Sequence, residues 1–190
     1  MSWPWKDFSK LPVDDQCSWG SWMAPLMACV TATEGPILEI GAGDWSTPFL
    51  HHYCACVNRA LVTVEADKEW AKRYDNLATP FHRIIPEPYM PALTSLLLEG
   101  RWAVALVDGS PSETRVHQCL LLKDRTEFLI VHDYSGKECI ETFTPDIVDQ
   151  WNAAAVAPRP QYSPSSLVLG WQQIPWFPGI RLGAQHEGPA

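Results

Sequence analysis

The 190-residue sequence predicts an α/β fold, a doubly wound and mostly parallel sheet of seven strands with an N-terminal and a C-terminal arm. Two observations predict this class. Short apolar runs, several rich in β-branched residues, alternate with amphipathic segments of about ten residues through the middle of the chain, as in βαβ units. Hydrophobic residues make up 46% of the chain and charged residues 19%, which provides the apolar material for one core.

Five apolar runs in the middle of the chain predict parallel strands. Each run is short and largely aliphatic, as expected for strands that are covered on both faces. The predicted strands cover residues 36–40, 60–64, 81–85, 102–107 and 127–131. One or two late strands are expected around residues 166–172, within a segment rich in proline and glycine.

Helices are predicted between these strands, where apolar residues recur at helical spacing. The predicted helices cover residues 18–33, 48–57, 68–77, 90–98, 112–122 and 145–156. Thr47 is the expected N-cap of the second helix, and Pro48 then occupies the first helical position, which tolerates proline. Pro25 fits the first helix only within its first turn.

The chain length predicts a single domain over residues 1–190. We divide it into an N-terminal arm (1–16), a core (17–156) and a proline-rich C-terminal segment (157–190). The six cysteines are expected to be reduced, because most lie inside apolar segments and their spacing fits neither a zinc site nor a redox pair.

Charge and hydropathy exclude several kinds of partner. The formal net charge is −8 and the sequence has no basic stripe, which argues against nucleic-acid binding. No apolar run approaches the ~20 residues that cross a bilayer, and the N-terminus lacks the apolar stretch of a signal peptide. The sequence therefore predicts a soluble, cytoplasmic protein without a nucleic-acid or membrane partner, and it leaves open whether the chain forms a homo-oligomer.

The carboxyl ends of the predicted strands are where functional residues are expected. Right-handed crossovers place these ends along one edge of a parallel sheet, and ligands bind at that edge. Gly41 and Gly43 follow the first strand and allow the backbone to turn sharply beside a ligand. Glu65 follows the second strand, 22 residues beyond Gly43, where a carboxylate can accept hydrogen bonds from both ribose hydroxyls. The alternatives are a plain turn at the glycines and a solvated strand end at Glu65.

The residues around the glycines decide between nucleotide cofactors. A dinucleotide site has a third glycine and a helix N-terminus open to a diphosphate, whereas this chain has Ser46 at that position and Pro48 in the first turn. Asp44 would also repel a diphosphate. S-adenosylmethionine has no phosphate and carries sulfonium and ammonium charges, which suit an acidic loop.

Four segments together resemble the class I S-adenosylmethionine-dependent methyltransferases. Residues 37–50 (ILEIGAGDWSTPFL) are similar to the first motif of that superfamily and residues 62–67 (VTVEAD) to the second. Residues 104–111 (VALVDGSP) and 128–134 (FLIVHDY) resemble the ends of the fourth and fifth strands in the small-molecule O-methyltransferase branch. The resemblance covers roughly residues 18–156 and implies a Rossmann-like methyltransferase fold.

The resemblance implies a role for each matching residue. The bend from Gly41 to Gly43 would cradle the methionine part of the cofactor, with Glu39 near its ammonium group. Glu65 would hold the ribose, and Asp108 would face the methyl-transfer region. The cofactor-binding residues implied in this way are Glu39, Gly41, Ala42, Gly43, Ser46, Glu65, Ala66, Glu87 and Asp108.

The resemblance also points to a second cofactor, a divalent cation such as Mg²⁺. In the catechol-type branch such an ion is held by an Asp after the fourth strand and an Asp-Asn pair after the fifth, and this chain offers Asp108 and Asp133. Tyr134 stands where the Asn would be, and the Lys that follows the fourth-strand Asp is missing. Two carboxylates could still bind a hard cation through oxygen.

A hydroxyl acceptor needs a group that takes its proton, and His132, Asp133 and Asp108 are the candidates at the strand ends. His132 could instead satisfy a backbone carbonyl, and Asp108 could simply shape a turn. The histidines inside predicted helices or strands are expected to be structural or exposed; they are His51, His52, His82 and His117.

Tryptophans are frequent in the terminal segments. We expect them to cover the ligand edge and to shape an apolar or planar acceptor pocket, or else to pack the arms against the body. They are Trp3, Trp5, Trp19, Trp22, Trp171 and Trp176.

Three functions are compatible with the sequence. The first is methyl transfer from S-adenosylmethionine to a small molecule, with oxygen favoured over nitrogen as the acceptor. The second is a catalytically silent S-adenosylmethionine-binding or interaction module, which the incomplete metal set suggests. The third is a nicotinamide-dependent oxidoreductase, which Ser46 disfavours.

Overall fold

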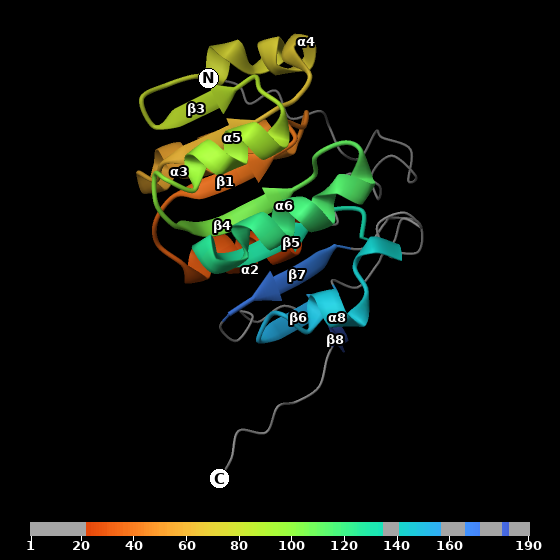
Figure 1. The fold of residues 1–190 in the computed structure, drawn as a ribbon. Coiled ribbons are helices and arrows are strands. Elements are labelled where there is room, and N and C mark those ends of the chain that lie inside the picture. Colours follow the sequence, from red (N-terminus) through yellow and green to blue (C-terminus); the bar gives the residue numbers. More distant parts are fainter. Residues whose placement is uncertain (1–21, 135–140, 157–165, 172–179, 183–190) are drawn as a thin grey trace, which may run out of the picture.

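A computed structural model describes residues 22–134, 141–156, 166–171 and 180–182 of the chain. Its strands form one sheet in the order β3-β2-β1-β4-β5-β7-β6-β8 (Figure 1). The bounds of the strands are β1 Ile37–Ile40, β2 Leu61–Val64, β3 His82–Ile85, β4 Trp102–Val107, β5 Thr126–Val131, β6 Ala153–Val156, β7 Leu167–Gly170 and β8 Ile180–Leu182. β1 to β5 are parallel, whereas β7 runs antiparallel to both β5 and β6, and β8 antiparallel to β6.

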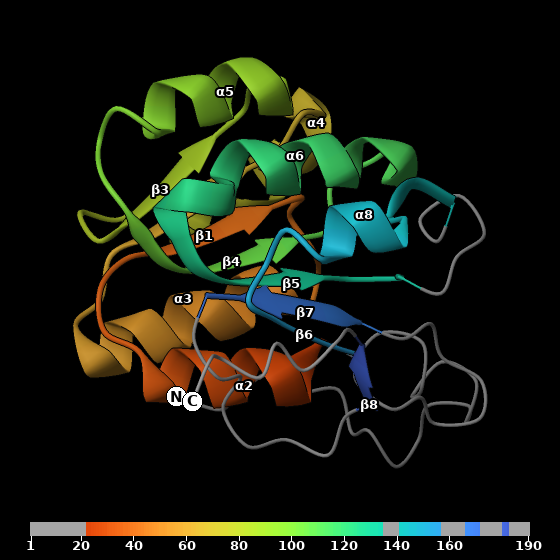
Figure 2. The ribbon, with the colours of Figure 1, turned by 60° about the horizontal axis from the view of Figure 1, so that its bottom comes forward.

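Helices cover both faces of this sheet. Figure 2 shows α5, α6 and α8 on one face and α2 and α3 on the other. The α-helices are α2 Met23–Ala32, α3 Ser46–Val57, α4 Lys68–Ala71, α5 Tyr89–Leu96, α6 Arg115–Leu122 and α8 Pro145–Val148. Shorter 3₁₀ turns are η2 Lys72–Leu77, η3 Ser112–Thr114 and η4 Lys123–Arg125. The predicted doubly wound, mostly parallel sheet is therefore confirmed.

Two apolar clusters, one under each helical layer, hold the sheet between them. Along β1, Leu38 and Ile40 pack into the cluster beneath α5 and α6, and Ile37 packs into the cluster beneath α2 and α3. All three are fully buried, because the central strands are covered on both faces. Because successive side chains of a strand point to opposite faces, Glu39 lies on the α3 side of the sheet. There its carboxylate accepts a hydrogen bond from Thr47 of α3.

The C-terminal part of the chain differs from the prediction. The described strands number eight rather than seven, because β8 adds to the antiparallel end of the sheet. The predicted helix over 145–156 is wrong in its second half: α8 ends at Val148, and Ala153–Val156 is the strand β6. Three consecutive alanines favour a helix locally, but pairing with β7, which lies further along the chain, overrides that preference.

The start of α3 also differs from the prediction. The helix begins at Ser46, two residues before the predicted start, and Thr47 lies inside its first turn. Thr47 is not an N-cap, because its hydroxyl donates to the buried carboxylate of Glu39. Pro48 still falls where the missing N–H costs nothing, since the first-turn amides have no partner within the helix.

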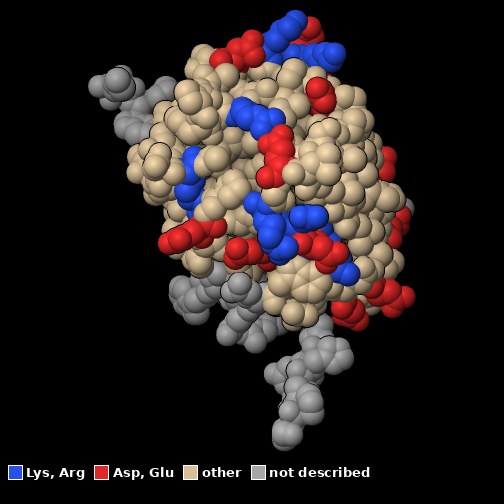
Figure 3. Space-filling view, turned by 60° about the vertical axis from the view of Figure 1, so that its left-hand side comes forward, with Lys and Arg blue, Asp and Glu red and all other residues tan. Residues whose placement is uncertain are grey.

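No helix among the described residues is long and apolar enough to cross a bilayer. On the face shown in Figure 3, Lys and Arg side chains are interspersed with Asp and Glu. Two exposed ion pairs join Arg83 to Glu99 at 2.6 Å and Arg73 to Asp44 at 2.7 Å.

Candidate active site

Four residues lie side by side where the parallel strands end: Glu65, Gly41, Asp108 and His132. Each is the first residue after its strand, and the backbone N–H of each donates to the last carbonyl of the neighbouring strand at 2.7 to 3.0 Å. These bonds continue the parallel ladder one residue beyond β2, β1, β4 and β5. The expected ligand edge is therefore a row of adjacent strand ends.

The glycine bend packs directly against the end of β4. Gly41 has a φ of 89°, a left-handed conformation, and a Cβ at this position would lie 2.5 Å from the Asp108 carbonyl oxygen. Only glycine avoids both the strain and the clash. The bend and Asp108 are therefore held together by backbone contact, which the sequence pattern alone did not show.

The carboxylate of Glu65 lies at the bend, as the spacing predicted. Its Oε2 accepts a hydrogen bond from the Ala42 N–H at 2.8 Å, and its Oε1 accepts from the Asp67 N–H at 2.8 Å. The Tyr89 hydroxyl also donates to Oε1 at 3.3 Å. Glu65 is 6% exposed, and because a carboxylate has about four acceptor positions, one is left for a ligand hydroxyl.

Tyr89 is a site residue that the sequence analysis missed. It begins α5, four residues after β3 ends at Ile85, and is buried between Glu65 and Gly109. Burial and the neighbouring Glu65 carboxylate raise the pKa of its hydroxyl to about 12, so that it acts as a neutral donor. Its position just beyond a strand end is the signal that could have identified it.

The segment after Glu65 fixes the bend from the outer side. The Trp70 indole N–H donates to the Ala42 carbonyl at 2.7 Å, and the Arg73 guanidinium stacks on the Trp70 ring at 3.9 Å. Arg73 and Tyr74 also pair with Asp44, at 2.7 and 3.1 Å. The acidic charge at Asp44 is thus partly neutralised by Arg73, which weakens its expected effect on a phosphate.

Glu39 is the implied cofactor residue that lies deepest. Its side chain is fully buried and points to Thr47 of α3 and Thr63 of β2. Ser46, the first residue of α3, is buried beside Gly43. Ala66 lies partly buried after Glu65, and Glu87 is exposed two residues beyond β3.

Three titratable side chains meet at the ends of β4 and β5. In His132, Nδ1 lies 3.2 Å from Asp108 Oδ2 and Nε2 lies 3.4 Å from Asp133 Oδ1. Neither contact is aligned as a hydrogen bond, although the ring is buried. The ring of His132 therefore faces two carboxylates rather than a backbone carbonyl, and desolvation raises the pKa of Asp133.

Arg115 joins this cluster, and the sequence analysis missed it too. Its buried guanidinium lies 2.9 Å from Asp108 Oδ1 and donates to the carbonyls of Gly109 (2.9 Å) and His132 (2.6 Å). One planar fork thus connects the loops after β4 and β5. No sequence signal marks it, because its neighbours Thr114, His117 and Gln118 are also polar, and its burial is visible only in the structure.

The same cluster contains donors for a cation. Among the described residues, Asp108, His132 and Asp133 each offer one ligand atom, and these atoms lie within 4.8 Å of one another. Two carboxylates and an imidazole fit a divalent ion in type and spacing. The fixed charge of Arg115 at Asp108 opposes a second positive charge.

The two described tryptophans from the terminal segments do not face this edge. Trp22 is buried against Phe49 beneath the α2–α3 layer. Trp171 follows β7 at the amino end of β5, where its indole donates to the Lys123 carbonyl at 2.6 Å. For these two the packing interpretation holds; Trp3, Trp5, Trp19 and Trp176 lie outside the described residues.

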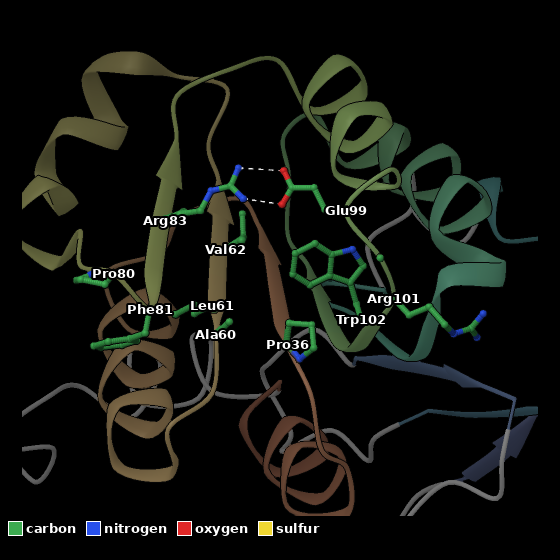
Figure 4. Close-up of a pocket in the computed structure, with 11 residues that line it drawn as sticks. Pro36, Ala60, Leu61, Val62, Pro80, Phe81, Arg83, Glu99, Arg101 and Trp102 are labelled. Atoms are coloured by element: carbon green, nitrogen blue, oxygen red, sulfur yellow. Dashed lines mark hydrogen bonds and ion pairs between the residues drawn. The ribbon is translucent and has the colours of Figure 1, made fainter.

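A pocket of about 170 Å³ lies at the opposite edge of the sheet, where the strands begin (Figure 4). Its walls include Pro36, Phe81 and Trp102, and the Arg83–Glu99 ion pair spans one end. It is smaller than the ~300 Å³ typical of sites for drug-sized ligands. None of the strand-end residues above lines it.

Comparisons with known proteins reveal similarity in structure alone. No family model matches the sequence, and no curated protein matches it. A solved structure from Klebsiella pneumoniae, provisionally assigned as an O-methyltransferase, is 16% identical with a TM-score of 0.61, covering 84% of this chain and 83% of that one. A human methyltransferase 10 domain containing protein is 14% identical with a TM-score of 0.48, covering 74% and 73%. The first comparison shows that the two chains share a fold.

Proposed function

Because the chain has the class I methyltransferase fold, we propose that it transfers a methyl group from S-adenosylmethionine to a hydroxyl oxygen of a small molecule. One observation carries this proposal. The bend that would hold the cofactor packs against the backbone of Asp108, so that the cofactor residues and the titratable cluster form one continuous edge. A methyl donor held at the bend would therefore lie beside groups that can accept a proton.

The cofactor half of this edge supports binding of a nucleoside that bears an amino-acid tail. Glu65 has acceptor capacity for a ribose hydroxyl, and its Oε2 already orients the Ala42 amide in the bend. Gly41 keeps the bend free of side chains.

The other half supports proton transfer. S-adenosylmethionine supplies, when bound, a methyl group on a sulfonium sulfur, and transfer breaks that carbon–sulfur bond as the carbon–oxygen bond forms. Asp133, the most exposed of the three side chains, accepts the hydroxyl proton or passes it on to His132, whose ring nitrogens are buried against Asp108 and Asp133. Arg115 holds the loops of these residues in place.

Binding measurements test the cofactor. We expect calorimetry to detect S-adenosylmethionine and its demethylated product but not NAD, and Glu65→Gln to weaken both about tenfold or more because a charge-assisted acceptor is lost. Glu87 is an exposed residue of the same edge, at the adenine end of the proposed site. Glu87→Gln therefore serves as the matched comparison for loss of a carboxylate there. Binding of NAD alone would favour an oxidoreductase and end this proposal.

Turnover with a labelled methyl donor tests the reaction. We expect label to enter hydroxyl compounds from a panel of phenols, alcohols and amines, and we expect His132→Ala to lower kcat by about 10²-fold or more while cofactor affinity changes little. Full turnover in both His132→Ala and Asp133→Ala would exclude the proton-transfer role. Cofactor binding with no transfer to any compound would identify a silent binding module instead.

A bound divalent cation would be held by Asp108, His132 and Asp133, where it would acidify a coordinated hydroxyl. We expect turnover to persist in a chelator, because Arg115 already supplies a positive charge beside Asp108. Loss of turnover in the chelator, with recovery on adding Mg²⁺, would assign the cluster to a metal.

A further inference from the structure

A buried chain of hydrogen bonds joins the glycine bend to α3, and the proposed proton transfer does not use it. Its centre is Glu39, which is fully buried. Glu39 Oε2 accepts hydrogen bonds from the hydroxyls of Thr63 at 2.7 Å and Thr47 at 2.9 Å. Among the described residues no well-aligned hydrogen bond reaches Glu39 Oε1, and the Ser46 hydroxyl is a further side-chain donor that lowers the pKa of this carboxylate. A carboxylate buried this deeply is costly, so its presence requires an explanation.

The chain continues from Thr63 toward the surface. Because the single hydroxyl hydrogen of Thr63 points to Glu39, its oxygen must accept from His82 Nε2, which lies 2.9 Å away. His82 then has no hydrogen on Nδ1, which accepts from His51 Nδ1 at 3.1 Å. His82 is fully buried and His51 is half-buried on α3. Every hydrogen in this chain therefore points toward Glu39.

The other end of the chain is the bend itself. The Gly43 N–H donates to the Thr47 hydroxyl oxygen at 2.9 Å, and the Gly43 carbonyl accepts from the Thr47 N–H at 3.2 Å. The hydrogen of the Thr47 hydroxyl is directed to Glu39, which leaves its oxygen free to accept from the Gly43 N–H. The orientation of the Gly43 peptide thus depends on a carboxylate four residues earlier on β1.

We propose that Glu39, Thr47, Thr63 and His82 are positioning residues that hold the Gly43 peptide of the bend, and that ionisation of Glu39 tightens this hold. The effect on cofactor affinity depends on the proposed function; the effect on the bend does not. Ionised Glu39 accepts charge-assisted hydrogen bonds, which are roughly twice as strong as those to a neutral carboxyl.

Burial and the surrounding groups make this ionisation relevant near neutral pH. Desolvation raises the pKa of Glu39 to about 7, while the hydroxyl hydrogen bonds oppose that rise. Desolvation lowers the pKa of His82 to about 4, which keeps its ring neutral and its Nδ1 an acceptor. The other titratable groups near this chain are Asp108, Cys54 and Tyr74 around Glu39, and His51 and His52 on α3.

The ligand-free protein provides the first test. We expect the Gly43 amide signal in ¹H–¹⁵N spectra to shift with pH, with its midpoint near neutrality, and we expect this titration to disappear in Glu39→Gln and Thr47→Val. Thr47→Ser, which keeps the hydroxyl, should restore it. Thr31→Val is the matched control, because the hydroxyl of this exposed helical threonine bonds only to its own helix. It should leave the Gly43 titration unchanged.

Cofactor affinity provides the second test. At pH 8.5 we expect Thr63→Val, which keeps the shape of the side chain, to weaken S-adenosylmethionine binding roughly tenfold, with Thr63→Ser near wild type. At pH 6 the difference between Thr63→Val and wild type should shrink. His82→Gln retains a donor toward Thr63 and should fall between them, whereas the exposed His117→Gln should match wild type.

The two proposals fail in different ways. A Gly43 amide that titrates equally in wild type and Glu39→Gln would overturn the positioning role, whatever the affinities are. Wild-type protein that does not bind S-adenosylmethionine, with an intact Gly43 titration, would overturn the proposed function alone. Unchanged affinity in Thr63→Val at pH 8.5, in protein that binds the cofactor, would show that the chain is structural only.

Discussion

At the scale of single residues, Gly41 is a position where two backbone constraints coincide. It combines a positive φ with a backbone oxygen 2.5 Å from where a Cβ would be. We expect Gly41→Ala to lower the free energy of unfolding by about 3 kcal/mol or more, as measured by urea denaturation. Gly35→Ala shares the positive φ but meets only one atom, at 3.8 Å, and should cost about 1–2 kcal/mol. Equal costs would mean that strain alone, and not contact with Asp108, requires glycine.

Arg115 gives a second prediction at this scale. Arg115→Met leaves the carbonyls of Gly109 and His132 without their donor and Asp108 without its ion pair, in a buried setting. We expect a loss of about 3 kcal/mol in the free energy of unfolding. Arg83→Met breaks an exposed ion pair of the same type and should cost less than about 1 kcal/mol. Similar losses in the two variants would show that Arg115 is not a buried clamp.

Glu39 and His82 predict opposite pH dependences. The raised pKa of Glu39 makes the folded state hold its proton longer, so its contribution to stability is present below about 4.5 and is lost as pH rises through about 7. The lowered pKa of His82 gives a contribution present above about 6.5 and lost as pH falls through about 4. Between about pH 4.5 and 6.5, the stability lost at Glu39 as the pH rises is partly offset by the stability gained at His82.

Single variants should separate the two contributions. In Glu39→Gln we expect the free energy of unfolding to rise with pH from about 4 to 6.5, by up to about 3 kcal/mol more than in wild type. In His82→Gln it should fall from about 4.5 to 7. Urea denaturation at four pH values measures both, and profiles parallel to wild type would contradict the assignment.

At the scale of elements, α4 is short and depends on its cap. The Asp67 side chain accepts from the N–H groups of Glu69 and Trp70, at 2.9 and 3.1 Å. We expect Asp67→Ala to cost about 1 kcal/mol of stability and to weaken cofactor binding, because Trp70 of this helix holds the Ala42 carbonyl. Asp75→Ala, in the following 3₁₀ turn, is the comparison and should leave affinity unchanged. Weaker binding in both variants would point to general destabilisation.

The elements that were predicted correctly are those with strong local patterns. The run over 102–107 has the predicted bounds, because six consecutive apolar residues with turn residues on both sides are typical of a buried parallel strand. The predictions for the alanines of β6 and for the start of α3 were wrong. The first depends on pairing with β7 and the second on the hydrogen bond between Thr47 and Glu39, and both partners lie outside the local segment. Local propensity contains no information about such partners.

At the scale of the whole molecule, ligand binding should appear as added stability. A ligand at 100 times its Kd stabilises the folded state by about 2.7 kcal/mol, which corresponds to a rise of roughly 5–10 °C in Tm for a chain of this size. We expect S-adenosylmethionine to produce this shift in a thermal melt and NAD to produce none. A shift of the same size in Glu65→Gln would place the ligand away from the strand-end edge.

The sequence by itself determined the parallel sheet, the edge at which strands end, and the positions of Gly41, Glu65, Asp108 and His132 along that edge. Periodicity and strand-end position are local properties, so they can be read from a single chain. Only the tertiary structure decided what each of these side chains meets: Arg115 and Tyr89 enter the edge from helices, and Glu39 turns away to a threonine and histidine network. Such contacts join residues far apart in sequence, and their energies depend on burial, which no local pattern encodes.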